Sequence, residues 1–245
     1  MKKSILVTVL CLICVPIIKS QHTDESVRWD FPVKFGTEEW NRLENIRELI
    51  DVCQIPEAVL TVLSTEELAE ICLRYPLLRF ITYSNNYDES IENLLSQFNG
   101  ARELFKRNDA SNALLKPYQA KMHDLSFLKD MPLGVERGFF VADIAAHELL
   151  ISHCLFPEDQ SQDGYREIMQ QLVSGYEEKL RYSEAFEGEF NVNLFARIKI
   201  LVKADPQILE LIPQHENNAV FWKGVTDKQT EQIINKLTYR FILPQ

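Results

Sequence analysis

The sequence predicts an all-α fold, an irregular multi-helix array that could take the form of an α-α superhelix of helical hairpins. The chain of 245 residues holds 8 glycines and 10 prolines. Together these are about 7% of the chain against roughly 12% in average proteins, which disfavours turn-rich β architectures. Apolar residues recur every three or four positions through most of the chain, which is the spacing of one helix face. The period-two alternation that is typical of β-strands does not persist anywhere after residue 20.

The first twenty residues are laid out as a secretory signal peptide. Two lysines precede an apolar run over residues 5–18, and Ser20 supplies a small residue for cleavage. The run contains Pro16 and is shorter than the roughly 20 residues that span a bilayer, so a retained membrane anchor is the less favoured interpretation. We therefore expect a signal peptide over residues 1–20 and no stable membrane span after its cleavage.

Export implies the periplasm or the extracellular space. Cys11 and Cys14 follow Leu10 and Ile13 instead of the small residues that bacterial lipidation requires, so the segment has no lipobox. The chain carries 26 Lys+Arg and 36 Asp+Glu, a net charge of −10. An acidic balance argues against a nucleic-acid partner and against adsorption to anionic lipid, because both need a basic footprint.

Residues 21–36 are expected to form an extended N-terminal strap. Pro32 favours an extended backbone at the residue before it, and Trp29 and Phe31 make the segment aromatic. Such a strap usually covers a hydrophobic groove of its own domain; the alternative is a projecting peptide that a partner binds. Trp29, Phe31 and Trp40 are therefore the candidate binding residues.

Residues 37–245 are expected to form a single α-helical domain, with a weak seam in the loop at 131–134. Thr37 can cap a first helix whose apolar stripe faces the core and holds Trp40, Leu43, Ile46, Ile50 and Cys53. Ser64 and Glu67 form a capping box at the start of another helix.

The later part of the chain contains the most strongly predicted helices. Residues 139–155 and 190–202 are apolar around most of their circumference, as in helices that other helices enclose. Residues 165–180 follow the spacing of an amphipathic helix. Ser111 can cap a helix that Pro117 shortens or bends, and Thr226 can cap the last helix.

Asp143 and His147 are the candidate catalytic residues, because a spacing of four places both on one helix face. Such a pair can orient an imidazole for base catalysis. No Ser or Cys nucleophile is specified nearby in the sequence, and structural pairing of two partly buried polar groups is the more common outcome. Non-enzymatic function is therefore favoured.

No metal site or cofactor is predicted. The run from His147 to His153 begins like a zinc-protease helix, but a gap of six residues turns the two rings about 240° apart on a helix. Glycine-rich phosphate loops, the G-x-S-x-G elbow and the EF-hand loop are all missing from the sequence.

Three cysteines follow the signal segment. A bridge between Cys53 and Cys72 would stabilise the chain in an oxidising compartment, whereas the apolar neighbours of Cys53, Cys72 and Cys154 favour buried free thiols. We favour the free thiols.

Several segments resemble an uncharacterised family of exported, mainly helical proteins from gut Bacteroidetes. They are Trp29-Asp30-Phe31-Pro32, Cys53-Gln54-Ile55-Pro56, the helix of 64–75, Glu103-Leu104-Phe105-Lys106-Arg107, 174–180 and the helix of 226–237. The resemblance covers most of the chain after residue 20. It implies an envelope or extracellular setting and assigns no catalytic residue.

The sequence therefore favours an exported helical binding or scaffold protein that offers a groove to a protein or peptide partner. One alternative is an exported hydrolase with a site around Asp143 and His147. Another is a carrier of a small molecule or lipid in a cavity between helices.

Overall fold

A computed structural model describes residues 29–84, 86–154, 162–186, 190–212 and 228–243. Every regular element within these residues is helical, which confirms the predicted all-α fold. The expected signal peptide, the first residues of the strap and the cap at Thr226 lie outside the described residues.

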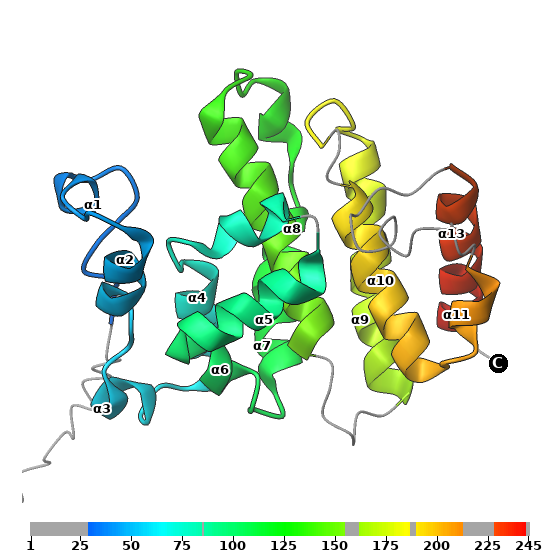
Figure 1. The fold of residues 1–245 in the computed structure, drawn as a ribbon. Coiled ribbons are helices and arrows are strands. Elements are labelled where there is room, and N and C mark those ends of the chain that lie inside the picture. Colours follow the sequence, from blue (N-terminus) through cyan, green and yellow to red (C-terminus); the bar gives the residue numbers. More distant parts are fainter. Residues whose placement is uncertain (1–28, 85, 155–161, 187–189, 213–227, 244–245) are drawn as a thin grey trace, which may run out of the picture.

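The elements follow one another across the molecule in nearly the order of the chain. Figure 1 shows α1, α2 and α3 at one side, α4 to α8 in the middle, and α9, α10, α11 and α13 at the other side. In chain order they are α1 (Glu38–Asn41), α2 (Ile46–Val52), α3 (Glu57–Leu60), α4 (Thr65–Leu73), the 3₁₀ helix η1 (Leu78–Tyr83), α5 (Tyr87–Gln97), α6 (Asn99–Leu104), α7 (Ala110–Met122), the 3₁₀ helix η2 (Ser126–Lys129), α8 (Val135–Cys154), α9 (Gln162–Leu180), α10 (Phe190–Ala204), α11 (Ile208–Leu211) and α13 (Lys228–Ile242).

The chain after Thr37 forms two short helices where one was expected. Thr37 caps α1 as predicted, because its side chain accepts a hydrogen bond from the amide of Trp40. Asn45 then caps α2 by accepting from the amides of Arg47 and Glu48. This second cap divides the expected apolar stripe. Helix α2 therefore turns a different face to the core than expected: Leu49 is buried, whereas Ile46 is 59% exposed. The prediction that Ile46 faces the core is therefore wrong.

Two further helix caps were predicted, at Ser64 and at Ser111, and the structure contains one of them. The capping box of Ser64 and Glu67 is present at α4, with both reciprocal hydrogen bonds formed, as predicted. Ser111 does not cap α7, which begins one residue earlier and continues through Pro117. The apolar face of α7 is buried on both sides of that proline, so tertiary packing maintains the helix where Pro117 removes one backbone hydrogen bond.

Helix α8 lies at the centre of the array. It packs against α7, α10, η1 and α5, while α9 packs against α7, α10 and α13. Nearly all residues of α8 from Val141 to Cys154 are buried, which confirms the prediction of an enclosed helix. Its neighbours α9 and α10 lie where the sequence predicted an amphipathic helix and a second enclosed helix.

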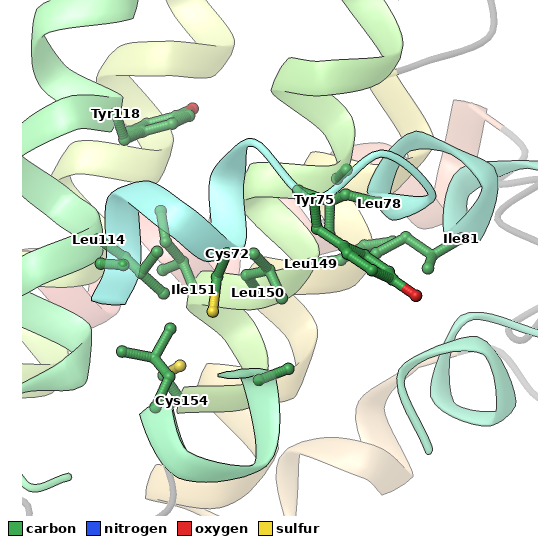
Figure 2. Close-up of a cluster of buried hydrophobic side chains, with 14 of the residues drawn as sticks. Cys72, Tyr75, Leu78, Ile81, Leu114, Tyr118, Leu149, Leu150, Ile151 and Cys154 are labelled. Carbon is green, nitrogen blue, oxygen red and sulfur yellow. The ribbon is translucent and has the colours of Figure 1, made fainter. Parts of the chain in front are cut away.

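One large hydrophobic cluster connects the strap to the central helices. It runs from Phe31 through α4, α7 and α8 to Leu201, and so contains residues from both sides of the loop at 131–134. Figure 2 shows part of it, with Cys72 of α4 beside Leu149, Leu150 and Cys154 of α8. The cysteines Cys53, Cys72 and Cys154 are buried free thiols, as the sequence favoured. In the part of the chain described, no helix combines the length and the apolar character that crossing a membrane requires.

Candidate binding groove

An open, largely apolar groove lies between the N-terminal helices and the segment that follows α4. Its volume is about 420 Å³, and its lining comes from α1, α2, η1 and α5. The apolar lining residues are Trp40, Ile46, Tyr75, Leu77, Phe80, Ile81 and Leu94, and the polar ones are Ser84, Ser90, Asn93 and Gln97. The volume falls in the roughly 300–1,000 Å³ range of ligand pockets.

The local chain geometry explains why large apolar side chains lie at this surface. Cap residue Asn45 starts α2 in a register that exposes Ile46. On the other side, Pro76 follows the end of α4 and the chain continues as η1, in which Leu78 and Ile81 are buried while Phe80 is 43% exposed. A 3₁₀ helix repeats every three residues, so Leu78 and Ile81 share one face of η1, which is buried, and Phe80 lies on another face that is exposed.

A second pocket, of about 370 Å³, shares Tyr75 with the groove. It is lined by Asp30, Phe31, Lys34, Phe35, Leu73, Arg74, Tyr75, Pro76, Arg79 and Asp143. Its charged side chains are mutually paired. Asp30 accepts from Lys34 at 2.7 Å and lies 3.5 Å from Arg74. The hydrogen bond from Lys34 is the main reason that the pKa of Asp30 lies below its ordinary value.

Tyr75 separates the two pockets. Its ring is 4% exposed and stacks on Phe98 at a centroid distance of 4.2 Å. Among the described residues, its buried hydroxyl has no hydrogen-bond partner. Burial raises the pKa of Tyr75, so the hydroxyl stays protonated and remains a donor. Figure 2 shows this oxygen pointing outward from the cluster of buried side chains.

The structure does not bring Asp143 and His147 together as a catalytic pair. The carboxylate of Asp143 binds the guanidinium of Arg79, with 3.2 Å between Oδ1 and Nε. Burial raises the pKa of Asp143, and the positive charge of Arg79 opposes this effect. His147 is fully buried, and its Nε2 donates to the carbonyl oxygen of Leu114 at 2.9 Å. Burial lowers the pKa of His147 to about 3, so the ring is neutral at physiological pH.

The chain matches no protein family, no curated protein and no solved structure with which it was compared. The assignment of function therefore rests on the geometry of the molecule.

The three candidate binding residues occupy different positions. Trp40 lines the groove and is half-buried, with its ring 4.9 Å from that of Phe35. Phe31 is buried, and its ring packs against those of Tyr75 and Phe98. Trp29 is half-buried and packs edge-on against Phe31 at 4.7 Å. The described part of the strap thus covers its own domain, and Trp40 is the candidate that faces the groove.

Sequence reasoning missed three residues that shape the groove: Ile46, Tyr75 and Phe80. The apolar spacing predicts Ile46 in the core because it does not take account of the cap at Asn45. A signal for the other two exists in the segment 75–83, where seven of nine residues are aromatic or apolar around Arg79 and Thr82. So short a segment cannot bury all of these side chains on one face.

The remaining titratable groups of the described segments form no metal site. Among the described residues, no group of three His, Cys, Asp or Glu side chains could hold a metal ion. His147 and His153 point to different neighbours: the ring of His147 packs edge-on against Tyr118, and that of His153 packs against Phe105.

Proposed function

We propose that this chain is an exported, non-enzymatic binding protein whose groove takes the apolar face of a basic amphipathic segment of a protein or peptide. The observation that supports this proposal most directly is the groove, on whose two walls the side chains of Ile46 and Phe80 are exposed. Large apolar side chains gathered around a concave surface are typical of interaction sites. A groove of this kind suits a helix that inserts residues spaced at i, i+3, i+4 and i+7.

The charges around the groove favour a basic partner. On one wall, residues 38–52, which form α1, α2 and the segment between them, carry five acidic and two basic residues. These are Glu38, Glu39, Glu44, Glu48 and Asp51, against Arg42 and Arg47. Helix α5 on the other wall carries Asp88, Glu89 and Glu92 and no basic residue. Complementary charge steers encounter and selects orientation, so basic residues beside the apolar face of the partner would meet acidic walls.

The export part of the proposal is supported by the layout of residues 1–20 and by the resemblance to an exported family. Production of the full chain in a bacterial host, followed by N-terminal sequencing of the periplasmic protein, tests it. A mature start at Gln21 is expected. Retention of the intact chain in the cytoplasm would overturn this part and leave the groove proposal unaffected.

Fluorescence anisotropy of a labelled 18-residue peptide tests the binding proposal. The peptide carries Leu at helical i, i+3, i+4 and i+7 positions and Lys elsewhere, and a matched peptide carries Glu in place of Lys. The Lys peptide is expected to bind at least tenfold more tightly than the Glu peptide. Its affinity should fall as salt is added, because salt screens exposed charges.

Variants locate the binding. Ile46→Ser and Phe80→Ser are expected to weaken binding at least tenfold without unfolding the chain, since Ile46 is 59% exposed and Phe80 is 43% exposed. Leu133→Ser is the matched control, because Leu133 is 84% exposed and lines neither pocket. Equal affinity in all three variants would overturn the proposal. Binding of octanoate at the groove in place of the peptide would favour the carrier, and cleavage of the peptide would favour the hydrolase.

A further inference from the structure

We propose that a separate basic pocket, at the start of α8, binds the phosphate group of a small phosphomonoester. The pocket has a volume of about 300 Å³ and is lined by Leu128, Lys129, Arg137, Arg181, Tyr182, Ser183 and Glu184. None of these residues lines the groove, so the inference does not depend on the proposed peptide binding.

Three cationic side chains from three separate segments meet at this pocket. Lys129 ends η2, Arg137 lies in the first turn of α8, and Arg181 follows the last residue of α9. The chain has a net charge of −10, and the groove has acidic surroundings. This pocket differs because positive side chains gather in it. Positive charges held close together repel one another, so they are more stable when an anion lies between them.

The carboxylates nearby neutralise only part of this charge. Glu178 pairs with Arg181 at 2.7 Å, and Glu184 is the one acidic residue in the lining. Within the described residues, neither Lys129 nor Arg137 has a carboxylate oxygen within 4.0 Å. Instead, the ammonium of Lys129 lies 5.6 Å from the centre of the Tyr182 ring.

Arg137 has an unused donor. Its Nη1 donates to the carbonyl oxygen of Met131 at a long 3.4 Å, and its Nε is buried with no acceptor among the described residues. A buried donor without an acceptor is energetically unfavourable. The described residues thus leave the charge of Arg137 without a carboxylate partner, and the first turn of the 20-residue helix α8 favours negative charge at the same place.

The donors and the size of the pocket favour a phosphomonoester. The guanidinium group of an arginine binds phosphate through two parallel hydrogen bonds. The hydroxyls of Tyr182 and Ser183 add two further donors to the lining. The ring of Tyr182 and the side chain of Leu128 supply an apolar wall for the organic part of the ester. A single small pocket without a basic stripe does not suit a nucleic-acid backbone.

Isothermal titration calorimetry with phenyl phosphate tests the site, with benzoate and sodium chloride at matched ionic strength as controls. Phenyl phosphate is expected to bind at least tenfold more tightly than benzoate. Inorganic phosphate, and phosphatidylcholine vesicles with and without phosphatidic acid, distinguish a free phosphate compound from a lipid headgroup. Heat of binding that chloride or benzoate reproduces would overturn the proposal.

Variants separate binding at this pocket from general charge effects. Arg137→Gln and Lys129→Gln are each expected to weaken phenyl phosphate binding at least tenfold. Lys129→Gln remains decisive if Arg137→Gln fails to fold, because Lys129 is exposed. Arg47→Gln removes one positive charge from exposed α2 and is expected to leave the affinity unchanged. Unchanged affinity in Lys129→Gln, or equal weakening in Arg47→Gln, would overturn the assignment.

Discussion

The ammonium Nζ of Lys179 lies 2.6 Å from Oε2 of Glu148, and neither side chain is exposed. The other carboxylate oxygen of Glu148 accepts from the hydroxyl of Tyr118 at 2.7 Å and from the amide of Asn193 at 2.8 Å. Helices α7, α8, α9 and α10 each contribute one of these side chains. A polar network therefore joins four helices inside a hydrophobic core.

Replacing Lys179 by Met is expected to destabilise the protein by about 3–5 kcal/mol, because it leaves the carboxylate of Glu148 buried without its counter-charge. Urea unfolding measures the loss. The double variant Glu148→Gln with Lys179→Met should recover part of it. Arg42→Gln, which breaks an exposed ion pair with Glu38, should have a much smaller effect. Equal effects of the buried and exposed changes would contradict this account.

Gly175 of α9 allows Tyr118 to reach Glu148. A Cβ at Gly175 would overlap the hydroxyl oxygen of Tyr118 and lie 2.8 Å from its Cζ. We expect Gly175→Ala to destabilise the protein by about 1–3 kcal/mol through overpacking, against the usual preference of helices for Ala. Tyr118→Phe should relieve part of the loss in the double variant.

Gly138 of α8 is the matched control for this prediction. A Cβ there meets nothing within 4 Å, so Gly138→Ala should stabilise the helix by about 0.5–1 kcal/mol. Thermal unfolding of both variants, monitored by circular dichroism, measures whether each substitution raises or lowers the stability of the protein. Stabilisation by Gly175→Ala would show that α9 can move away from Tyr118.

Local signals in the sequence predicted much of this fold. Thr37 and the Ser64–Glu67 box are caps whose action depends on neighbouring residues only. The enclosed helix α8 is predicted because its residues are apolar around most of its circumference. Asn45 is a cap of the same kind, and a prediction from apolar spacing alone, without this cap, puts Ile46 in the core.

The sequence could not predict the contacts that join distant segments. Glu148 and Lys179 are 31 residues apart, and in a sequence each resembles an exposed residue of a helix. Asp143 and His147 share a spacing that allows contact, but Arg79 and the carbonyl of Leu114 come from other elements and bind them separately. The groove depends on η1 lying beside α2, which no local pattern indicates.

Acid should destabilise the protein through His147. Its pKa is lowered from 6.5 to about 3 by burial, so the unfolded chain binds a proton that the folded chain does not between these two values. Stability therefore falls as the pH drops from about 6.5 to 3, by up to about 1.4 kcal/mol per pH unit for this group. Burial also lowers the pKa of His153, to about 4, and adds to the slope.

The variant His147→Gln tests this titration. An amide can donate to Leu114 in place of Nε2, and it takes up no proton, so urea unfolding between pH 4 and pH 7 should give a shallower dependence of stability on pH. His123→Gln, at an exposed position, is the matched control and should keep the parent slope. Parallel pH profiles for the parent and His147→Gln would contradict the assignment of His147 as a buried neutral ring.

The thiols of Cys53, Cys72 and Cys154 should be protected from alkylation in the folded protein. The thiolate is the reactive form, and burial raises the pKa of Cys53 to about 11 and that of the other two thiols as well. Iodoacetamide at pH 8, followed by mass spectrometry of peptides, is expected to label them only when the chain opens. A mass increase of about two daltons on reduction would instead indicate a disulfide.

The relative labelling rates also test whether residues 37–245 unfold as one unit. Cys53 and Cys72 precede the loop at 131–134 and Cys154 follows it, yet all three belong to the same hydrophobic cluster. A segment that opens independently exposes its own thiols first. If the chain opens cooperatively, the three thiols become labelled at one common rate in moderate urea. Earlier labelling of Cys154 alone would place a domain boundary at that loop, because the second half of the cluster would then open while Cys53 and Cys72 stayed buried.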